Sequence, residues 1–112
     1  MACLFCKIIA GEIPAKKVFE DDLTYAFRDI HPQAPTHVLI VPRKHIASLA
    51  ESEAEDIGMI GHLHLVAARI AVSEGLSKGF RTVINTGPDG GQTVDHLHVH
   101  LLGGRAMGWP PG

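Results

Sequence analysis

Apolar residues in the first 42 positions gather into three short runs that are typical of β-strands. Two of the runs flank the acidic turn Asp21-Asp22, and the third is a dense β-branched and apolar run (THVLIV) that Pro42 ends. Two prolines within residues 30–35 exclude regular structure between the second and third runs. The predicted elements are a helical turn at Phe5–Ala10 and strands at Lys17–Glu20, Thr24–Asp29 and Thr36–Val41.

The pattern changes to helical spacing after residue 50. Apolar residues recur at intervals of three and four from Ile57 to Ile70, which places them on one face of a helix. The segment Ser52–Glu55 has the pattern of a capping box before this helix, and Gly75 is a plausible stop after it. The remaining predicted elements are a strand at Phe80–Asn85, a glycine-rich loop at Thr86–Thr93, a last strand at His96–Leu102 and a tail at Arg105–Gly112.

The order of these elements is strand, strand, strand, helix, strand, strand. Short connections among the first three strands favour antiparallel pairing. One long helix is enough to cover one face of the resulting sheet. The sequence therefore predicts an α+β fold that forms a single domain over residues 1–112.

Composition and charge narrow the functional classes. A net charge of −2 over 112 residues provides no general attraction for nucleic acid. Residues 1–14 lack the basic start and apolar run of a secretory signal, and no stretch approaches the roughly 20 apolar residues of a membrane span. We therefore expect a cytoplasmic protein with no nucleic-acid or membrane partner. In that compartment Cys3 and Cys6 are expected to be thiols or metal ligands rather than a disulfide.

Three histidines near the C-terminus, His96, His98 and His100, alternate with apolar residues. On a strand they would line one face, each roughly 7 Å from the next. Histidine is a weak strand former, so a function explains three of them better than propensity does. The residues alone leave three interpretations open: surface histidines without a function, a metal site, or a nucleophilic histidine with supporting neighbours.

The loop before these histidines is a candidate phosphate cradle. Its glycines, Gly91 among them, let backbone N–H groups approach an anion closely, and Gln92 and Thr93 add side-chain donors. An ordinary surface loop is the alternative.

His37, at the start of the predicted central strand, is either a structural residue or an extension of the imidazole cluster as a proton relay.

A second candidate site involves the two cysteines near the N-terminus. Cys3 and Cys6, together with His45 and His96, would complete a tetrahedral structural zinc site. Two cysteines also occur as free or partly buried thiols, and the sequence leaves both interpretations open.

The segment Gly91–Leu102 (GQTVDHLHVHLL) resembles the signature of the histidine triad (HIT) superfamily, in which three histidines alternate with apolar residues. Segments at Ala34–His37 and Pro42–Ile46 are similar to corresponding segments of that family, and the resemblance covers nearly the whole chain. The ending Trp109–Gly112 resembles the histidine triad nucleotide-binding (HINT) branch.

This resemblance implies a five-stranded antiparallel sheet with one long and one short helix, joined to a second sheet across a homodimer. It implies a site for a purine nucleoside monophosphate, with His98 as nucleophile, His100 on the phosphate, and His37 and His96 as a supporting relay. The other residues that it implies are Asp29 at the ribose hydroxyls, Ile30 near the base, and Asn85, Gly91, Gln92 and Thr93 around the phosphate and the leaving group.

The reaction that the resemblance implies is hydrolysis of a purine nucleoside phosphoramidate or acyl-nucleotide, which releases AMP through a nucleotidyl-His98 intermediate. It requires no cofactor, and a protonated His100 or Thr93 would assist the departing amine. Two other hypotheses stay open. One is a nucleotide-binding regulatory dimer with little turnover, and the other is a zinc-binding member of the family built on Cys3, Cys6, His45 and His96.

Overall fold

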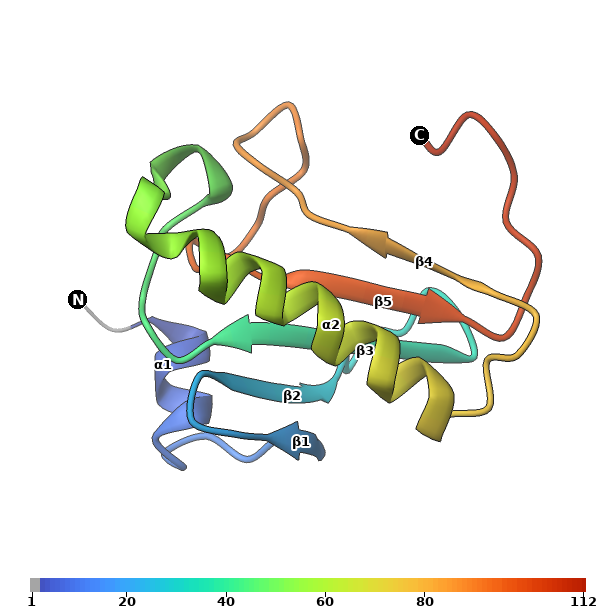
Figure 1. The fold of residues 1–112 in the computed structure, drawn as a ribbon, viewed down its shortest axis with the longest axis horizontal. Coiled ribbons are helices and arrows are strands. Elements are labelled where there is room, and N and C mark those ends of the chain that lie inside the picture. Colours follow the sequence, from blue (N-terminus) through green and yellow to red (C-terminus); the bar gives the residue numbers. More distant parts are fainter. Residues whose placement is uncertain (1–2) are drawn as a thin grey trace.

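The computed structural model describes residues 3–112 and has the predicted α+β architecture (Figure 1). None of the helices within these residues is long and apolar enough to cross a membrane. The elements in chain order are α1 (Leu4–Ile9), β1 (Lys17–Glu20), β2 (Thr24–Arg28), β3 (Thr36–Pro42), the 3-10 turns Leu49–Glu51 and Ala54–Asp56, α2 (Ile57–Ser73), β4 (Phe80–Val83) and β5 (Val99–Gly103).

The strands form one antiparallel sheet in the order β1-β2-β3-β5-β4. Strand β5 therefore lies beside the central strand β3, where His100 pairs with Leu39 and Leu102 pairs with His37. Because side chains alternate along a strand, His37, Leu39 and His100 share one face of the sheet. This register brings together two histidines that lie 63 residues apart in the sequence.

Strand β3 is apolar on both faces because both faces are covered. Val38 and Ile40 belong to the main core beneath α2, which runs across the sheet (Figure 1). Leu39 and Val41 belong to a second cluster with Phe5 and Ile8 of α1, on the opposite face. The dense run that predicts a central strand is thus a consequence of burial on two sides.

The capping box lies one residue later than the predicted Ser52–Glu55, and it caps the 3-10 turn Ala54–Asp56 that leads into α2. The Glu53 N–H donates to the Asp56 carboxylate at 2.8 Å, so the reciprocal pair is Glu53 and Asp56. The ammonium of Lys44 also donates to Asp56, at 2.7 Å. Lys44, which binds Asp56, lies outside the Ser52–Glu55 segment, so the local sequence pattern does not reveal this contact.

The last two strands are shorter than predicted. Strand β4 ends at Val83 rather than Asn85, and β5 begins at Val99 rather than His96. The pairing with β3 begins only at Val99, and before it the Leu97 N–H donates to Ile46 O at 2.7 Å. The predicted strand at His96–Leu102 is therefore wrong at its start: of the three histidines only His100 lies within a strand.

Candidate active site and metal centre

The side chains of His37, His98 and His100 meet on the sheet face opposite α2. His37 Nε2 lies 2.9 Å from His100 Nδ1, and the ring centroids of His98 and His100 are 4.9 Å apart. The backbone N–H of Gln33 donates to His37 Nδ1 at 3.0 Å, so a neutral His37 carries its proton on Nε2 and donates it to His100 Nδ1. His100 then carries its own proton on Nε2, the nitrogen that remains free for a ligand.

The main chain sets the orientation of His98. Its Nδ1 lies 2.7 Å from the carbonyl oxygen of His96, and because a carbonyl can only accept, Nδ1 carries the proton. Nε2 therefore presents a lone pair, the form that a nucleophile requires. Phe5 of α1 packs edge-on against the His98 ring, with centroids 5.1 Å apart, so packing fixes the ring as well.

Burial lowers the pKa of His37 and of His98 below the usual imidazole value. Burial, together with unfavourable interaction with His98 and His37, lowers the pKa of His100 to about 4, and the Asp29 carboxylate opposes this shift. The three rings are therefore neutral at neutral pH. The lowered pKa favours a neutral His100, which can donate a hydrogen bond from Nε2, over the predicted protonated form.

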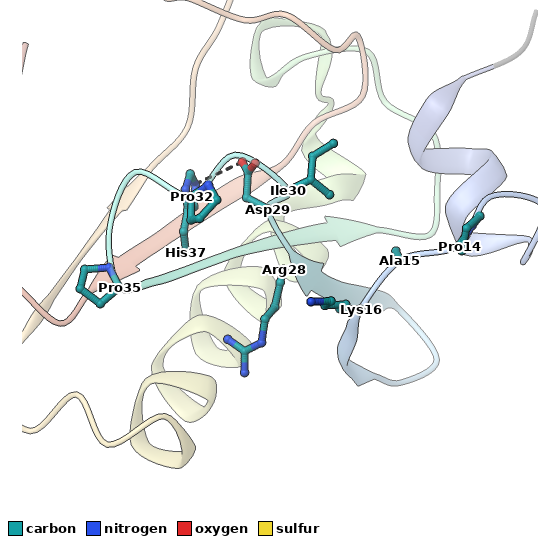
Figure 2. Close-up of a pocket in the computed structure, with 9 residues that line it drawn as sticks. All are labelled: Pro14, Ala15, Lys16, Arg28, Asp29, Ile30, Pro32, Pro35 and His37. Atoms are coloured by element: carbon teal, nitrogen blue, oxygen red, sulfur yellow. Dashed lines mark ion pairs between the residues drawn. The ribbon is translucent and has the colours of Figure 1, made fainter.

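Asp29 follows β2 and lies beside the histidines. Its Oδ1 accepts the backbone N–H of His31 at 2.8 Å, and its Oδ2 lies 3.5 Å from His37 Nε2. A cavity of about 580 Å³ opens here (Figure 2). The side chains that line it are those of Pro14, Ala15, Lys16, Arg28, Asp29, Ile30, Pro32, Pro35 and His37. A carboxylate held at such a cavity is suited to accept hydrogen bonds from sugar hydroxyls.

A second cavity, of about 310 Å³, lies against α1 and shares Pro14, Ala15, Arg28, Asp29 and Ile30 with the first. Its apolar lining includes Phe5, Ile8, Phe27 and Leu39, and its polar lining includes Thr93, His98 and His100. This combination suits a flat apolar group that carries an anionic end. The contribution of α1 was not predicted, although Phe5 and Ile8 are spaced by three residues and so share a helix face.

Two loop residues that were predicted near a phosphate have other partners. The side-chain amide of Gln92 donates to Ala47 O at 2.7 Å and to Val94 O at 3.0 Å, and it accepts the Gly87 N–H at 3.0 Å. Asn85 donates to Gly90 O at 2.7 Å. These amides hold the shape of the loop, and Thr93 is the residue of the predicted cradle that lines the cavity.

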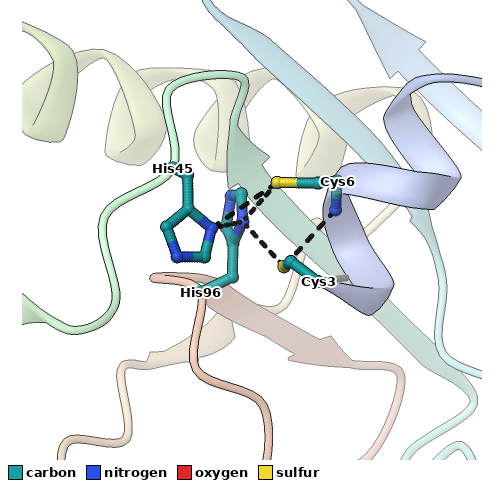
Figure 3. Close-up of side chains that lie close together, drawn as sticks. All are labelled: Cys3, Cys6, His45 and His96. Atoms are coloured by element: carbon teal, nitrogen blue, oxygen red, sulfur yellow. Dashed lines mark hydrogen bonds between the residues drawn. The ribbon is translucent and has the colours of Figure 1, made fainter. Parts of the chain in front are cut away.

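The predicted metal ligands Cys3, Cys6, His45 and His96 come together between α1 and the segments next to β3 and β5 (Figure 3). One ligand atom from each lies within 4.8 Å of the others. The Nδ1 atom of His96 is 3.4 Å from Cys3 Sγ, 3.6 Å from Cys6 Sγ and 3.1 Å from His45 Nδ1. Ligand atoms around a tetrahedral zinc ion with two sulfurs and two nitrogens lie about 3.3–3.8 Å apart, so these residues fit zinc.

The tautomer of His96 supports the same conclusion. Its Nε2 lies 2.8 Å from the Pro42 carbonyl oxygen and must donate, which leaves a lone pair on Nδ1 toward the cysteines.

Asp29, His37 and His100 also lie within 4.8 Å of one another. That group does not fit a metal, because the N–H of Gln33 occupies one nitrogen of His37 and the other nitrogen donates to His100.

The ring of His96 is therefore not placed in a relay with His37. Its Nε2 faces Pro42 and its Nδ1 faces the cysteines. The residue reaches His98 through its backbone carbonyl instead. This arrangement corrects the prediction that the His96 imidazole supports the triad directly.

Comparison with known proteins agrees with this geometry. The family model of the HIT domain matches residues 10–107. The chain belongs to the HIT family. An uncharacterized HIT-like protein of Synechococcus elongatus is 61% identical over 97% of this chain and 96% of its own length. The 14 kDa zinc-binding protein of Zea mays is 54% identical over 97% and 87% of the two chains.

Other similar proteins place the HIT chain in the HINT-like branch. The adenylylsulfatase HINT1 of Arabidopsis thaliana is 52% identical over 97% of this chain and 76% of its own length. The crystal structure of a HIT family hydrolase from Legionella pneumophila superposes with a TM-score of 0.97, at 54% identity over 99% and 100% of the chains. A histidine triad nucleotide-binding protein from Candida albicans superposes with a TM-score of 0.83, at 35% identity over 97% and 83%.

Proposed function

We propose that this HIT protein hydrolyses purine nucleoside phosphoramidates or acyl-nucleotides and releases AMP. The observation that carries the proposal is the tautomer of His98. The His96 carbonyl takes the Nδ1 proton, and the Nε2 lone pair is left at a cavity that Thr93 and His100 also line. The names of the Legionella and Arabidopsis relatives, a hydrolase and an adenylylsulfatase, support hydrolysis of a bond to a nucleotide phosphorus.

In the proposed first step, His98 Nε2 attacks the α-phosphorus. A nitrogen–phosphorus bond forms to His98, and the bond from phosphorus to the leaving amine breaks. The Nδ1–H to carbonyl hydrogen bond stabilises the positive charge that develops on the ring. The amine takes a proton from the Thr93 hydroxyl, and His100 donates from Nε2 to a phosphoryl oxygen.

In the second step, water attacks the same phosphorus and the bond to His98 breaks. One proton of the water returns to Thr93, and AMP leaves with the added oxygen. The base is expected to pack against Phe5, Phe27 and Leu39, with Ile30 at the cavity mouth and the ribose hydroxyls on Asp29. The Gly91 and Gln92 N–H groups donate within the loop, to Pro88 O at 3.1 Å and Gly87 O at 3.0 Å, so in this proposal Thr93 and His100 supply the donors to the phosphate.

The test uses adenosine 5′-phosphoramidate, with adenylyl sulfate as a second substrate. We expect His98→Ala to lose activity by a factor on the order of 10³ or more while AMP binding and the circular dichroism spectrum remain. His64→Ala removes an exposed histidine of α2 and is the matched control. Full activity of His98→Ala refutes the proposal. AMP binding without turnover by the unmodified protein favours the alternative of a regulatory nucleotide-binding dimer.

We further propose that Cys3, Cys6, His45 and His96 hold a structural zinc ion. The support is their mutual geometry and the enforced lone pair on His96 Nδ1, together with the zinc-binding name of the maize relative. Zinc would cross-link α1 to the segments that follow β3 and precede β5. Metal analysis after dialysis should give about one zinc per chain, and Cys6→Ser should bring the ratio near zero. A ratio near zero for the unmodified protein refutes this proposal.

We also propose a homodimer through β4 and α2. In the described sheet β4 is an edge strand, so its outer N–H and C=O groups are available to a second copy. Large apolar side chains are exposed on both elements, among them Phe80 of β4 at 45% and Leu65 and Val72 of α2 at 50% and 81%. The tail lies beside this edge, where Arg81 donates to Gly108 O at 2.8 Å, and it is expected to reach the partner's site.

A further inference from the structure

Helix α1 belongs to two sites at once. It has only six residues, and its N-cap is Cys3, whose sulfur accepts the Cys6 N–H at 3.5 Å. Isolated helices this short are unstable in water, so contacts with the rest of the protein must hold α1 in place. Those contacts come from the two cysteines on one side and from buried apolar residues on the other.

The buried residues of α1 form a wall of the cavity at His98. Phe5 and Ile8 are 4% and 8% exposed, and both line that cavity. The Phe5 ring packs edge-on against His98 at 5.1 Å, His96 at 5.9 Å and Phe27 at 5.4 Å between centroids. Phe5 lies between Cys3 and Cys6 in the sequence, so anything that fixes the two cysteines also fixes this ring.

We propose that a metal ion at Cys3, Cys6, His45 and His96 and a purine nucleotide in the cavity at His98 strengthen each other's binding through α1. Phe5 is the positioning residue between the two sites. The inference rests on the proposed nucleotide site and the proposed metal site, and it adds a regulation that neither site has alone.

The geometry provides two routes for this coupling. Through α1, metal binding would join Cys3 and Cys6 to His45 and His96 and so hold Phe5 and Ile8 against the sheet. Through the backbone, it would fix His96, whose carbonyl oxygen orients His98 at 2.7 Å. A nucleotide that packs on Phe5 would hold α1 in the same position and so bring the cysteines close to His45 and His96. Because linkage is reciprocal, each ligand must raise the affinity for the other by the same factor.

The test measures AMP affinity by calorimetry in zinc-loaded and chelator-treated full-length protein, and zinc affinity with and without AMP. We expect AMP to bind about tenfold more tightly with zinc, and zinc to bind more tightly with AMP by the same factor. Phe5→Leu keeps an apolar side chain but loses the aromatic contacts, and it should lower the coupling factor while still binding zinc. Lys7→Ala, on the same helix but outside the cavity lining, is the matched control.

The outcomes separate the coupling from the proposed function. Equal AMP affinity with and without zinc overturns the coupling and leaves the nucleotide site intact. No AMP binding in either form overturns the nucleotide site and the coupling together. No zinc binding overturns the metal site and the coupling, and an unchanged coupling factor in Phe5→Leu overturns the role of Phe5.

Discussion

Acidification should destabilise this protein through His100. The pKa of this ring is lowered from an ordinary value near 6.5 to about 4 in the folded state. As pH falls below 6.5 the unfolded chain takes up a proton that the folded protein refuses until about pH 4. The free energy of unfolding therefore falls over this window. With the full pKa shift, the free energy of unfolding would fall by about 2 kcal/mol between pH 7 and pH 5. Because the ring is partly exposed, we expect a fall of about 1–2 kcal/mol.

Urea unfolding at pH 7 and pH 5, with chelator present to remove metal binding, measures this loss. His100→Gln removes the titrating group but keeps a side-chain N–H donor, so the variant should lose about 1–2 kcal/mol less than the unmodified protein. Titration of the His100 ring proton by NMR gives its pKa independently. Equal losses in the two proteins, or a measured pKa near 6.5, would refute the reasoning.

Three further predictions concern single positions. Asp29→Ala should weaken AMP binding about tenfold by calorimetry and leave the 2′,3′-dideoxy analogue unaffected; equal weakening of both would exclude a hydrogen bond to the ribose. Gly90→Ala should cost about 1–3 kcal/mol in urea unfolding, because its Cβ would clash with the backbone of Thr86; a neutral result would show that the loop relaxes freely. Val72→Glu should give a monomer by light scattering, with Glu51→Ala as surface control; an unchanged dimer would place the interface elsewhere.

The sequence predicts the elements whose cause is local. The run from Thr36 to Val41 is apolar at nearly every position because β3 is buried on both faces, and the apolar spacing after Ile57 follows the face of α2. Both patterns depend on side-chain burial within one element. Short connections also account for the antiparallel pairing of β1, β2 and β3, but not for the place of β5 between β3 and β4.

The sequence does not predict what depends on distant partners. His96, His98 and His100 alternate as if on a strand, yet each is oriented by a different group: the Pro42 carbonyl, the His96 carbonyl and the His37 ring. The first and last of these partners lie far away in the chain. The same cause explains the shifted capping residue, because Lys44 is the partner of Asp56.

The segment that matches the HIT family model begins after the first residues of the two candidate sites. The HIT model begins at residue 10, whereas Cys3, Phe5, Cys6 and Ile8 all precede it. A protein trimmed to the matched segment would keep every triad histidine and would still be recognised as a HIT domain. It would lack two candidate zinc ligands and one wall of the cavity beside His98. For this chain, the limits of the matched domain are therefore a poor guide to the shortest segment that contains both candidate sites.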